Sequence, residues 1–484
     1  MTSYDFENPV EEAKRIVLNI SNKASTPCGV AIKIRTDHVN MWADLWKTDI
    51  TIIPKDGITE SESLDVNNTK RLLRYCLYNI YSCVREHVNT EVNPLNLSVI
   101  DINGQVAYDG DIWLIPLLLM IKPDVARSLI EFRYNIINIA RQLAAGYGYK
   151  GTKFPYCNDT IGYKNTLYYD VAGPMAVFNT ALVSMSTWNY FRISKDRDWL
   201  LSKGYPILKG NAEFLVSRID VDDDGTYHLR NVVDMAGNEN TDENTFTNNV
   251  VRLALKFAVE ASYELNYSPK DAWLNCYYFL PILFYPNTTP PYIPLLKYFA
   301  DSIDTDIYTI LEPLVCLVPY YYSQIFQVNS VTDFVKKNFD FYSTRIDNTY
   351  VTHPYNIVCQ GIMNSLYAQY DPNFINTFKT FFDTFASTFV QGVWGNFSKA
   401  YGQGNDIVLN ALCLFMVVQG IAQLNIQGGV ADTRFYYEEL KLNALTTANM
   451  PSTWKNIKIS GTGEDLKTWI ITNSIFYVGF PCGP

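Results

Sequence analysis

One run of side chains has the types and spacing of an ion-binding loop: residues 220–225, which read Asp-Val-Asp-Asp-Asp-Gly. Carboxylates at alternating positions before a glycine imitate the start of a calcium-binding loop, in which the twelfth residue is a bidentate glutamate. The twelfth residue here is Asn231. Asp and Gly also favour tight turns, so we interpret the run as the acidic turn of a β-hairpin and not as a calcium site.

Histidine and cysteine usage argues against a metal centre and against a disulfide framework. The chain has only four His among its 484 residues, so we predict no metal site and no cofactor. Its nine Cys are dispersed, without a Cys-x-x-Cys pair. Such a set is typical of free thiols that pack as small hydrophobic side chains in a reducing compartment.

Charge and hydropathy exclude two classes of partner. Lys and Arg number 39 against 49 Asp and Glu, which gives a formal net charge of -10, and no long basic block is present. We therefore predict no binding to nucleic acid or to anionic lipid. The most apolar stretch, residues 112–121, is too short to span a bilayer, and the polar, acidic residues 1–15 do not resemble a signal peptide. These features predict a cytoplasmic or virion-associated protein without a membrane span.

The elements that must position any site are mostly helices. Apolar side chains recur every three to four residues from about residue 69 to 425, with Asn68 and Thr69 as the expected first N-caps. Pro-, Gly- and Asn-rich connections separate the segments, a spacing that predicts antiparallel helical hairpins rather than a parallel sheet. The aromatic run at 320–322 has helical spacing and is expected in the core. Further helices are expected at 123–146, 174–193, 205–218, 248–265, 292–303, 331–344, 354–370, 372–388 and 405–424.

The two ends of the chain differ from this helical middle. Residues 29–53 contain the alternating runs Val-Ala-Ile-Lys-Ile-Arg and Asp-Ile-Thr-Ile-Ile, and residues 454–478 alternate again. Alternation with a period of two predicts short strands. We therefore predict a mainly α protein with a short N-terminal β or linker segment (1–60), a large helical domain (61–430) and a small C-terminal β appendage (431–484).

Several blocks of sequence follow one another in the order found in a known family. Residues 108–113 read Tyr-Asp-Gly-Asp-Ile-Trp, and residues 148–156 read Gly-Tyr-Lys-Gly-Thr-Lys-Phe-Pro-Tyr. Phe-Thr-Asn follows at 246–248, Asn-Phe-Ser-Lys-Ala-Tyr-Gly at 396–402 and Met-Pro-Ser-Thr-Trp at 450–454. Together these blocks resemble glycoside hydrolase family 65, which holds acid trehalases, kojibiose and maltose phosphorylases and a glucosyl-galactosyl-hydroxylysine glucosidase.

The resemblance implies an (α/α)6 barrel, with six inner and six outer helices, whose loops at one end form a sugar pocket. It also implies a large N-terminal β-sandwich. This chain departs from the family there, because only about 60 residues precede the first clear helical pattern. In the relatives that domain helps to shape the pocket or the dimer, so we expect a more open pocket here.

Hydrolysis with inversion needs two carboxyl groups: an acid that protonates the leaving oxygen and a base that activates water. The family's acid lies in a Pro-Asp-Glu-Tyr segment upstream of the Phe-Thr-Asn block. Counting back without gaps places Ala236 or Gly237 at that position, and only a shift of two or three residues brings Glu239 there. Glu239 is thus a tentative general acid, and the alternative is a solvated loop glutamate.

The second chemical group is missing from the sequence. The family's hydrolases carry their base in a Val-Trp-x-Glu segment before Asn-Phe, where this chain reads Val-Trp-Gly at 393–395, with no carboxylate from 384 to 405. A Gln or Gly cannot accept a proton from water at neutral pH. Phosphorylases replace the base with phosphate, but the family's Lys-Gln motif becomes Leu-Glu at 311–312 here. A glutamate at that position would repel phosphate.

Sugar binding is implied for several retained positions. The resemblance implies that Asp109 accepts hydrogen bonds from sugar hydroxyls, since one carboxylate can accept from two of them, and that Trp113 packs on a pyranose face. The alternative is that Asp109 and Asp111 only cap the following helix or face solvent. The complete set of expected substrate-binding residues is Asp109, Asp111, Trp113, Lys153, Tyr156, Asn248 and Asn396.

Two functions from different classes follow. Packing positions are retained while several chemical positions are lost, which favours a catalytically degenerate member that serves as a structural or carbohydrate-binding component. The Asn-, Ile- and Tyr-rich composition would suit a viral particle protein, whose partners would be a glycan, copies of itself or other particle proteins. The alternative is an active inverting α-glucoside hydrolase or phosphorylase of the trehalose, kojibiose or maltose type, with Glu239 as general acid.

Overall fold

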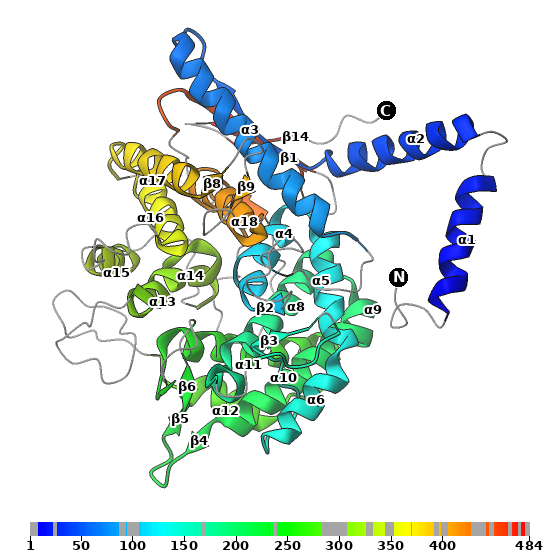
Figure 1. Cartoon of the computed structure of the whole chain (residues 1–484). Coiled ribbons are helices and arrows are strands. Elements are labelled where there is room, and N and C mark those ends of the chain that lie inside the picture. Colours follow the sequence, from blue (N-terminus) through cyan, green and yellow to red (C-terminus); the bar gives the residue numbers. More distant parts are fainter. Residues whose placement is uncertain are drawn as a thin grey trace. The chain divides into compact units, whose positions relative to one another are not determined.

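The computed structural model divides the chain into two compact units, Met1–Asp49 and Ile50–Pro484 (Figure 1). The domain boundaries predicted at residues 60 and 430 stay predictions, and the helix predicted at 292–303 lies outside the described residues. The structure describes residues 8–22, 27–86, 93, 106–159, 161–166, 170–233, 235, 240–282, 307–325, 333–343, 353–368, 370–391, 396–397, 405–426, 442–444, 450–462, 467–472 and 476–479.

The N-terminal unit contains two helices, α1 (Pro9–Asn22) and α2 (Pro27–Leu45). The strand predicted from Val-Ala-Ile-Lys-Ile-Arg is wrong, because this run, residues 30–35, lies inside α2. Proline has a backbone φ that suits the first position of a helix, and no second proline interrupts the segment. Alternation alone makes no strand, because the backbone groups of a strand need a neighbour to pair with, and no described strand pairs with this run.

The second unit is built on an (α/α)6 barrel, in which each of six outer helices is followed along the chain by an inner one. Each inner helix contacts the inner helices before and after it, and the last contacts the first, so the inner ring is closed. The outer helices are α3 (Glu60–Cys83), α5 (Pro123–Asn135), α10 (Tyr205–Arg218), α12 (Asp271–Phe279), α15 (Asp333–Ser343) and α17 (Phe374–Phe389). The inner helices are η2 (Gly110–Leu114) with α4 (Ile115–Ile121), α8 (Phe178–Ser194), α11 (Thr245–Glu264), α13 (Ile307–Leu317) with α14 (Pro319–Ile325), α16 (Pro354–Tyr367) and α18 (Ile407–Phe415) with η5 (Met416–Ile421).

The two layers differ in how their side chains are distributed. Nearly every side chain of α8, α16 and α18 is buried, whereas α17 buries one face formed by Ile375, Phe378, Phe382, Phe385 and Phe389. A helix with apolar residues on all sides must be surrounded by protein, while an amphipathic helix can border solvent. Shorter helices complete this body: α6 (Ile137–Gly146), α7 (Ala172–Met175), α9 (Arg197–Trp199) and η3 (Leu200–Gly204).

The first outer helix begins earlier than the sequence periodicity predicts. Helix α3 starts at Glu60, so the N-caps expected at Asn68 and Thr69 are wrong. The N-cap is Thr59, whose hydroxyl accepts a hydrogen bond from the Glu62 N–H (3.3 Å), while the Glu62 carboxylate accepts one from the Thr59 N–H (2.8 Å). This reciprocal capping box fixes the start of the helix in a stretch with few apolar side chains.

A four-stranded sheet joins residues from both ends of the second unit. Its order is β1 (Asp49–Pro54), β12 (Trp454–Thr462), β13 (Lys467–Thr472) and β14 (Phe476–Gly479), with the last three strands antiparallel. The strands predicted at Asp-Ile-Thr-Ile-Ile and within 454–478 are therefore confirmed. The Trp454 ring packs edge-on against Phe382 of α17 at a centroid distance of 6.4 Å, so the sheet rests on the outer layer of the barrel.

Short strand pairs connect the helices, among them β4 with β5. This hairpin confirms the acidic turn, in which the Asp222 N–H donates to the Thr226 carbonyl (3.0 Å) and Gly225 adopts a positive φ of 83°. The pairs in the described part of the chain are β2 (Val106–Ala107) with β3 (Cys157–Asn158), β4 (Asp220–Val221) with β5 (Tyr227–His228), β6 (Val232–Val233) with β7 (Asn240–Thr241), β8 (Val390–Gln391) with β9 (Asn396–Phe397), and β10 (Leu424–Ile426) with β11 (Leu442–Ala444).

Three further predictions concern the core and the surface. Tyr320, Tyr321 and Tyr322 are buried in α14, which confirms that the run belongs to the core. The eight cysteines in the described part of the chain are free thiols, and Cys482 lies outside it. Among the described helices, none combines the length and apolar character that a membrane span requires.

Candidate functional site

A carboxylate and three phenols lie together near the N-terminal ends of η2 and α16 and the start of β3. Asp109 is the N-cap of η2 and is half-buried, and Tyr108 precedes it. Tyr355, in the first turn of α16, donates its hydroxyl hydrogen bond to Oδ1 of Asp109. The Tyr156 ring lies 5.0 Å from the Tyr108 ring. We call Tyr108, Asp109, Tyr156 and Tyr355 the Asp109 cluster.

The phenols of this cluster stay protonated. Burial raises the pKa of Tyr108, Tyr156 and Tyr355, and the negative charge of Asp109 raises each of them further. Every hydroxyl therefore keeps its proton at ordinary pH and can donate one hydrogen bond. A carboxylate surrounded by phenol groups offers both acceptors and aromatic surface, which are the groups that contact sugars.

Asp111 and Trp113 lie behind the cluster and not at its surface. Asp111 is buried, and its carboxylate is 2.6 Å from the Arg133 guanidinium; desolvation nevertheless raises its pKa, because burial outweighs the attraction of the arginine. Trp113 is 0% exposed, and its ring packs against Tyr355 at 5.3 Å and Phe415 at 5.7 Å. The Trp113 ring is therefore covered by protein in this structure, and its predicted stacking on a sugar stays a prediction.

Lys153 is also buried away from the cluster. Its ammonium group donates to the Ala176 carbonyl (2.9 Å) and lies over the rings of Tyr147 and Phe214. Burial lowers the pKa of Lys153 to about 7, and the positive charge of Arg218 adds to this effect. The Lys153 side chain is enclosed by protein in this structure, and its predicted contact with a substrate stays a prediction.

Asn248 supports the start of α11 rather than a ligand. It is buried, and its Nδ2 donates to Glu243 Oε2 (2.7 Å) and to the Pro281 carbonyl (3.3 Å). The main chain of Asn396 pairs with Gln391 in the β8–β9 hairpin, and its side chain lies outside the described part of the structure. Glu239, the tentative general acid, also lies outside the described residues, between β6 and β7 in the sequence.

Glu312 has a structural contact that the sequence could not indicate. Its side chain is completely buried, with Oε1 accepting from the Met235 N–H (2.7 Å) and Oε2 from Asn244 Nδ2 (2.6 Å). Asn244 in turn caps α11 by accepting from the Thr247 N–H (2.8 Å). The carboxylate therefore ties α13 to the segment around Met235, whose carbonyl accepts a 3.4 Å hydrogen bond from the Tyr156 hydroxyl of the cluster.

Comparison with known proteins shows which proteins this chain resembles. A model of the glycosyl hydrolase family 65 central catalytic domain matches residues 74–275, a span that contains Asp109 and Tyr156. The kojibiose hydrolase of Mucilaginibacter mallensis is 29% identical over 490 residues, which cover 97% of this chain and 63% of that protein. Both matches support the resemblance to glycoside hydrolase family 65.

Other relatives are named for different activities. A kojibiose phosphorylase of Caldanaerobacter subterraneus is 28% identical over half of this chain and 31% of that protein. A protein-glucosylgalactosylhydroxylysine glucosidase of Danio rerio is 28% identical over half of this chain and 37% of that protein. The chain spans less than two thirds of the length of the two kojibiose hydrolases that it matches.

A solved structure supports the same fold. It belongs to a protein described as a kojibiose phosphorylase from the human microbiome, and it superposes with a TM-score of 0.71 at 15% sequence identity. The match covers 98% of this chain and 69% of that one. At this identity the likeness concerns the fold alone.

One carboxylate near the cluster was missed by the family 65 motifs. Asp406 is the buried N-cap of α18: its carboxylate accepts from the Leu409 N–H (3.0 Å), and its own N–H donates to the Phe397 carbonyl (2.7 Å). Its negative charge helps to raise the pKa of Tyr355. Asp406 thus links Phe397 to the neighbourhood of Tyr355, the partner of Asp109. The sequence could indicate that Asp406 caps a helix, but it could not indicate that Asp406 lies near Tyr355.

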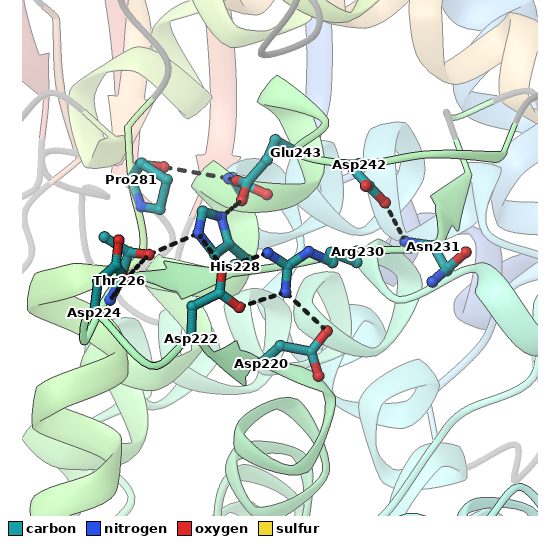
Figure 2. A network of polar contacts seen from close by, with 11 residues as sticks. Asp220, Asp222, Asp224, Thr226, His228, Arg230, Asn231, Asp242, Glu243 and Pro281 are labelled. Atoms are coloured by element: carbon teal, nitrogen blue, oxygen red, sulfur yellow. Dashed lines mark hydrogen bonds and ion pairs between the residues drawn. The ribbon is translucent and has the colours of Figure 1, made fainter.

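A second missed feature is a polar network beside the start of α11 (Figure 2). His228 contacts Glu243 Oε1 through Nδ1 (2.7 Å) and the Thr226 hydroxyl through Nε2 (2.9 Å). Arg230 donates two hydrogen bonds to the Asp222 carboxylate, at 2.8 and 2.7 Å. These contacts anchor the β4–β5 hairpin to Glu243, which adopts a positive φ of 62°. The acidic run was visible in the sequence, but its partners were not.

Proposed function

We propose that this chain is a glucoside-binding member of family 65 in which the catalytic pair is degenerate. The observation that carries the proposal is the Asp109 cluster, which assembles four side chains from three separate segments at one end of the barrel. Asp109 is half-exposed, so its carboxylate can accept hydrogen bonds from the hydroxyl groups of a sugar. The names of the relatives make an α-glucoside the first ligand to test.

The loss of catalysis follows from the chemistry of the base. Inversion requires an acid and a base about 6.5–9.5 Å apart, with room for water between them. The segment from 384 to 405 contains no carboxylate, and Asp406 uses its side chain to cap α18. Phosphorolysis is not favoured either, because the buried Glu312 would repel a phosphate dianion brought near it.

An active enzyme is the second candidate. The 29% identity to a kojibiose hydrolase over 97% of this chain favours it. In that case Glu239 would be the general acid, and Asp406, whose cap contact engages only Oδ1, would be the carboxylate to test as the base. A structural role in a particle, alone or with copies of the chain, stays a prediction from the sequence.

Binding and turnover measurements separate the two candidates. We expect calorimetric titration with kojibiose and methyl α-glucoside to detect binding that Asp109→Ala weakens about 10- to 100-fold, because hydrogen bonds to a charged group contribute about 1.5–3 kcal/mol. Asp223→Ala, a change on the exposed turn of the β4–β5 hairpin, is the matched control and should leave binding unchanged.

Turnover is assayed on the same proteins. We expect no release of glucose or glucose 1-phosphate from kojibiose, trehalose, maltose or nigerose, with or without phosphate. Turnover at ordinary enzyme rates that Glu239→Gln abolishes would refute the degenerate assignment and establish the second candidate. Absence of glucoside binding by the unaltered protein would refute the binding function itself.

A further inference from the structure

The buried carboxylate of Glu312 holds two points of the segment that precedes α11. Its Oε1 accepts a hydrogen bond from the Met235 N–H (2.7 Å), and its Oε2 accepts one from Asn244 Nδ2 (2.6 Å). Glu312 itself lies in α13, and all three residues are at most 1% exposed. A side chain of the inner layer therefore fixes the position of Met235 relative to the start of α11.

Met235 connects Glu312 to the Asp109 cluster. Its N–H donates to Glu312, and its carbonyl accepts the hydrogen bond from the Tyr156 hydroxyl (3.4 Å). Tyr156 is half-buried, and its ring packs against Tyr108 at a centroid distance of 5.0 Å. Packing orients the ring, and Met235 orients its hydroxyl. A displacement of Met235 therefore removes the acceptor that holds this hydroxyl in place.

We propose that Glu312 is a positioning residue for ligand binding: by holding Met235, it sets the position at which Tyr156 contacts a glucoside. This inference rests on the proposed glucoside-binding function, in which Tyr156 belongs to the Asp109 cluster. It gives the Glu312 carboxylate an effect on the site although that carboxylate is completely buried and cannot reach a ligand. The glutamate that disfavours phosphorolysis thus supports the binding of an uncharged sugar.

The donors around Glu312 make an exchange of two side chains informative. Two N–H donors face its two carboxylate oxygens, whereas the amide of Glu312→Gln has one acceptor and one donor. Asn244 cannot turn its own amide to compensate, because its Oδ1 accepts from the Thr247 N–H (2.8 Å). Glu312→Gln therefore sets two donors against each other. In Glu312→Gln/Asn244→Asp the new amide donates to the new carboxylate, and the two backbone N–H groups keep their acceptors.

Calorimetric titration with methyl α-glucoside, at a temperature where every variant is folded, measures the effect on affinity. We expect Tyr156→Phe to weaken binding about two- to tenfold, the effect of one neutral hydrogen bond, and Glu312→Gln to weaken it measurably but by no larger factor. In the Tyr156→Phe background, Glu312→Gln should have no further effect on affinity. Glu312→Gln/Asn244→Asp should restore the affinity of the unaltered protein.

Asn189→Ala is the matched control for a loss of stability alone. Asn189 is buried in α8 and donates two hydrogen bonds, to the Tyr320 hydroxyl and to Gln324 Oε1, both at 3.0 Å. It lies about three turns, or roughly 16 Å, beyond Phe178, the first residue of α8, whose ring packs against the cluster. Asn189→Ala should lower the thermal unfolding temperature and leave affinity unchanged.

A milder variant keeps the test decisive if Glu312→Gln does not fold. Glu312→Asp retains both acceptor oxygens but withdraws them by one methylene group, and it then replaces Glu312→Gln in the comparison of the two backgrounds. The expected pattern is the same: weaker binding when Tyr156 is present and no effect on affinity in Tyr156→Phe.

Several results would overturn the inference. These are an unchanged affinity of the Glu312 variant, equal weakening by it in both backgrounds, failure of the exchange with Asn244 to restore affinity, or no effect of Tyr156→Phe. In each case Asp109→Ala would still weaken binding, so the proposed function survives. Absence of glucoside binding by the unaltered protein would refute both.

Discussion

The buried Lys153 makes the stability of this protein depend on pH in a defined direction. Its pKa is lowered to about 7 in the folded chain, chiefly by burial, against an ordinary value of 10.5. Between these two values the unfolded chain binds a proton at this position that the folded chain does not. The free energy of unfolding therefore rises as pH increases from about 7 towards 10. Below pH 7 the buried lysine is charged in the folded chain as well, and the whole loss of stability caused by its burial is present.

Replacing Lys153 with methionine removes this titration while keeping a side chain of similar length. The maximum slope for one group is about 1.4 kcal/mol per pH unit, so the difference between the two proteins should change by roughly 2 to 3 kcal/mol between pH 7 and 9. The substitution also removes the hydrogen bond to the Ala176 carbonyl, a constant cost of about 1 kcal/mol. We expect Lys153→Met to be the more stable protein at pH 6, and its advantage to become smaller by roughly 2 to 3 kcal/mol as the pH rises from 7 to 9.

Urea unfolding followed by tryptophan fluorescence at pH 6, 7, 8 and 9 measures this difference. Lys209→Met, a change at an exposed position of α10, is the matched control and should run parallel to the unaltered protein at every pH. All other titrating groups cancel in the comparison. A constant difference between Lys153→Met and the unaltered protein across this range would refute the reasoning, because it would mean that Lys153 stays charged in the folded state.

Two further changes test contacts that support the site and the barrel. Arg133→Met should lower the free energy of unfolding by about 3–5 kcal/mol, because it leaves the buried Asp111 carboxylate without its cation. In thermal unfolding, the double variant Asp111→Leu/Arg133→Met should recover most of this loss. A double variant as unstable as the single one would contradict this explanation. Thr59→Ala should lower the free energy of unfolding by about 1 kcal/mol, because it removes the capping box of α3, and Thr59→Ser should keep the stability of the unaltered protein. Equal stability of the unaltered protein and both variants would show that the cap contributes nothing.

The helical content could be predicted because an amphipathic face is a local property of the chain. The spacing of apolar residues anticipated α10, α16 and α17 to within a few residues, since each helix needs only its own sequence to define the buried face. The start of α3 was missed although the signal was present: Thr59 and Glu62 have the spacing of a capping box. The run inside α2 shows the opposite error, because six alternating residues satisfy a strand pattern while the longer segment continues as a helix.

The site depended on contacts that no local pattern contains. Family 65 motifs pointed to Asp109, but they also pointed to Trp113 and Lys153, which the structure encloses completely. Tyr355, the direct partner of Asp109, lies 246 residues away along the chain. Closure of the inner helical ring brings the start of α16 beside the start of η2, and this closure decides which motif residues are buried and which remain partly exposed.

The sequence by itself indicated the resemblance to family 65, the mainly helical fold and the absence of a carboxylate between 384 and 405, because each is a matter of residue order and local spacing. The tertiary structure decided burial and pairing. It set Glu312 against Asn244, enclosed Lys153 and joined β1 to β12 across about 400 residues. Such contacts are fixed by how the helices pack around the ring, and packing depends on the shapes of segments that are remote in the sequence.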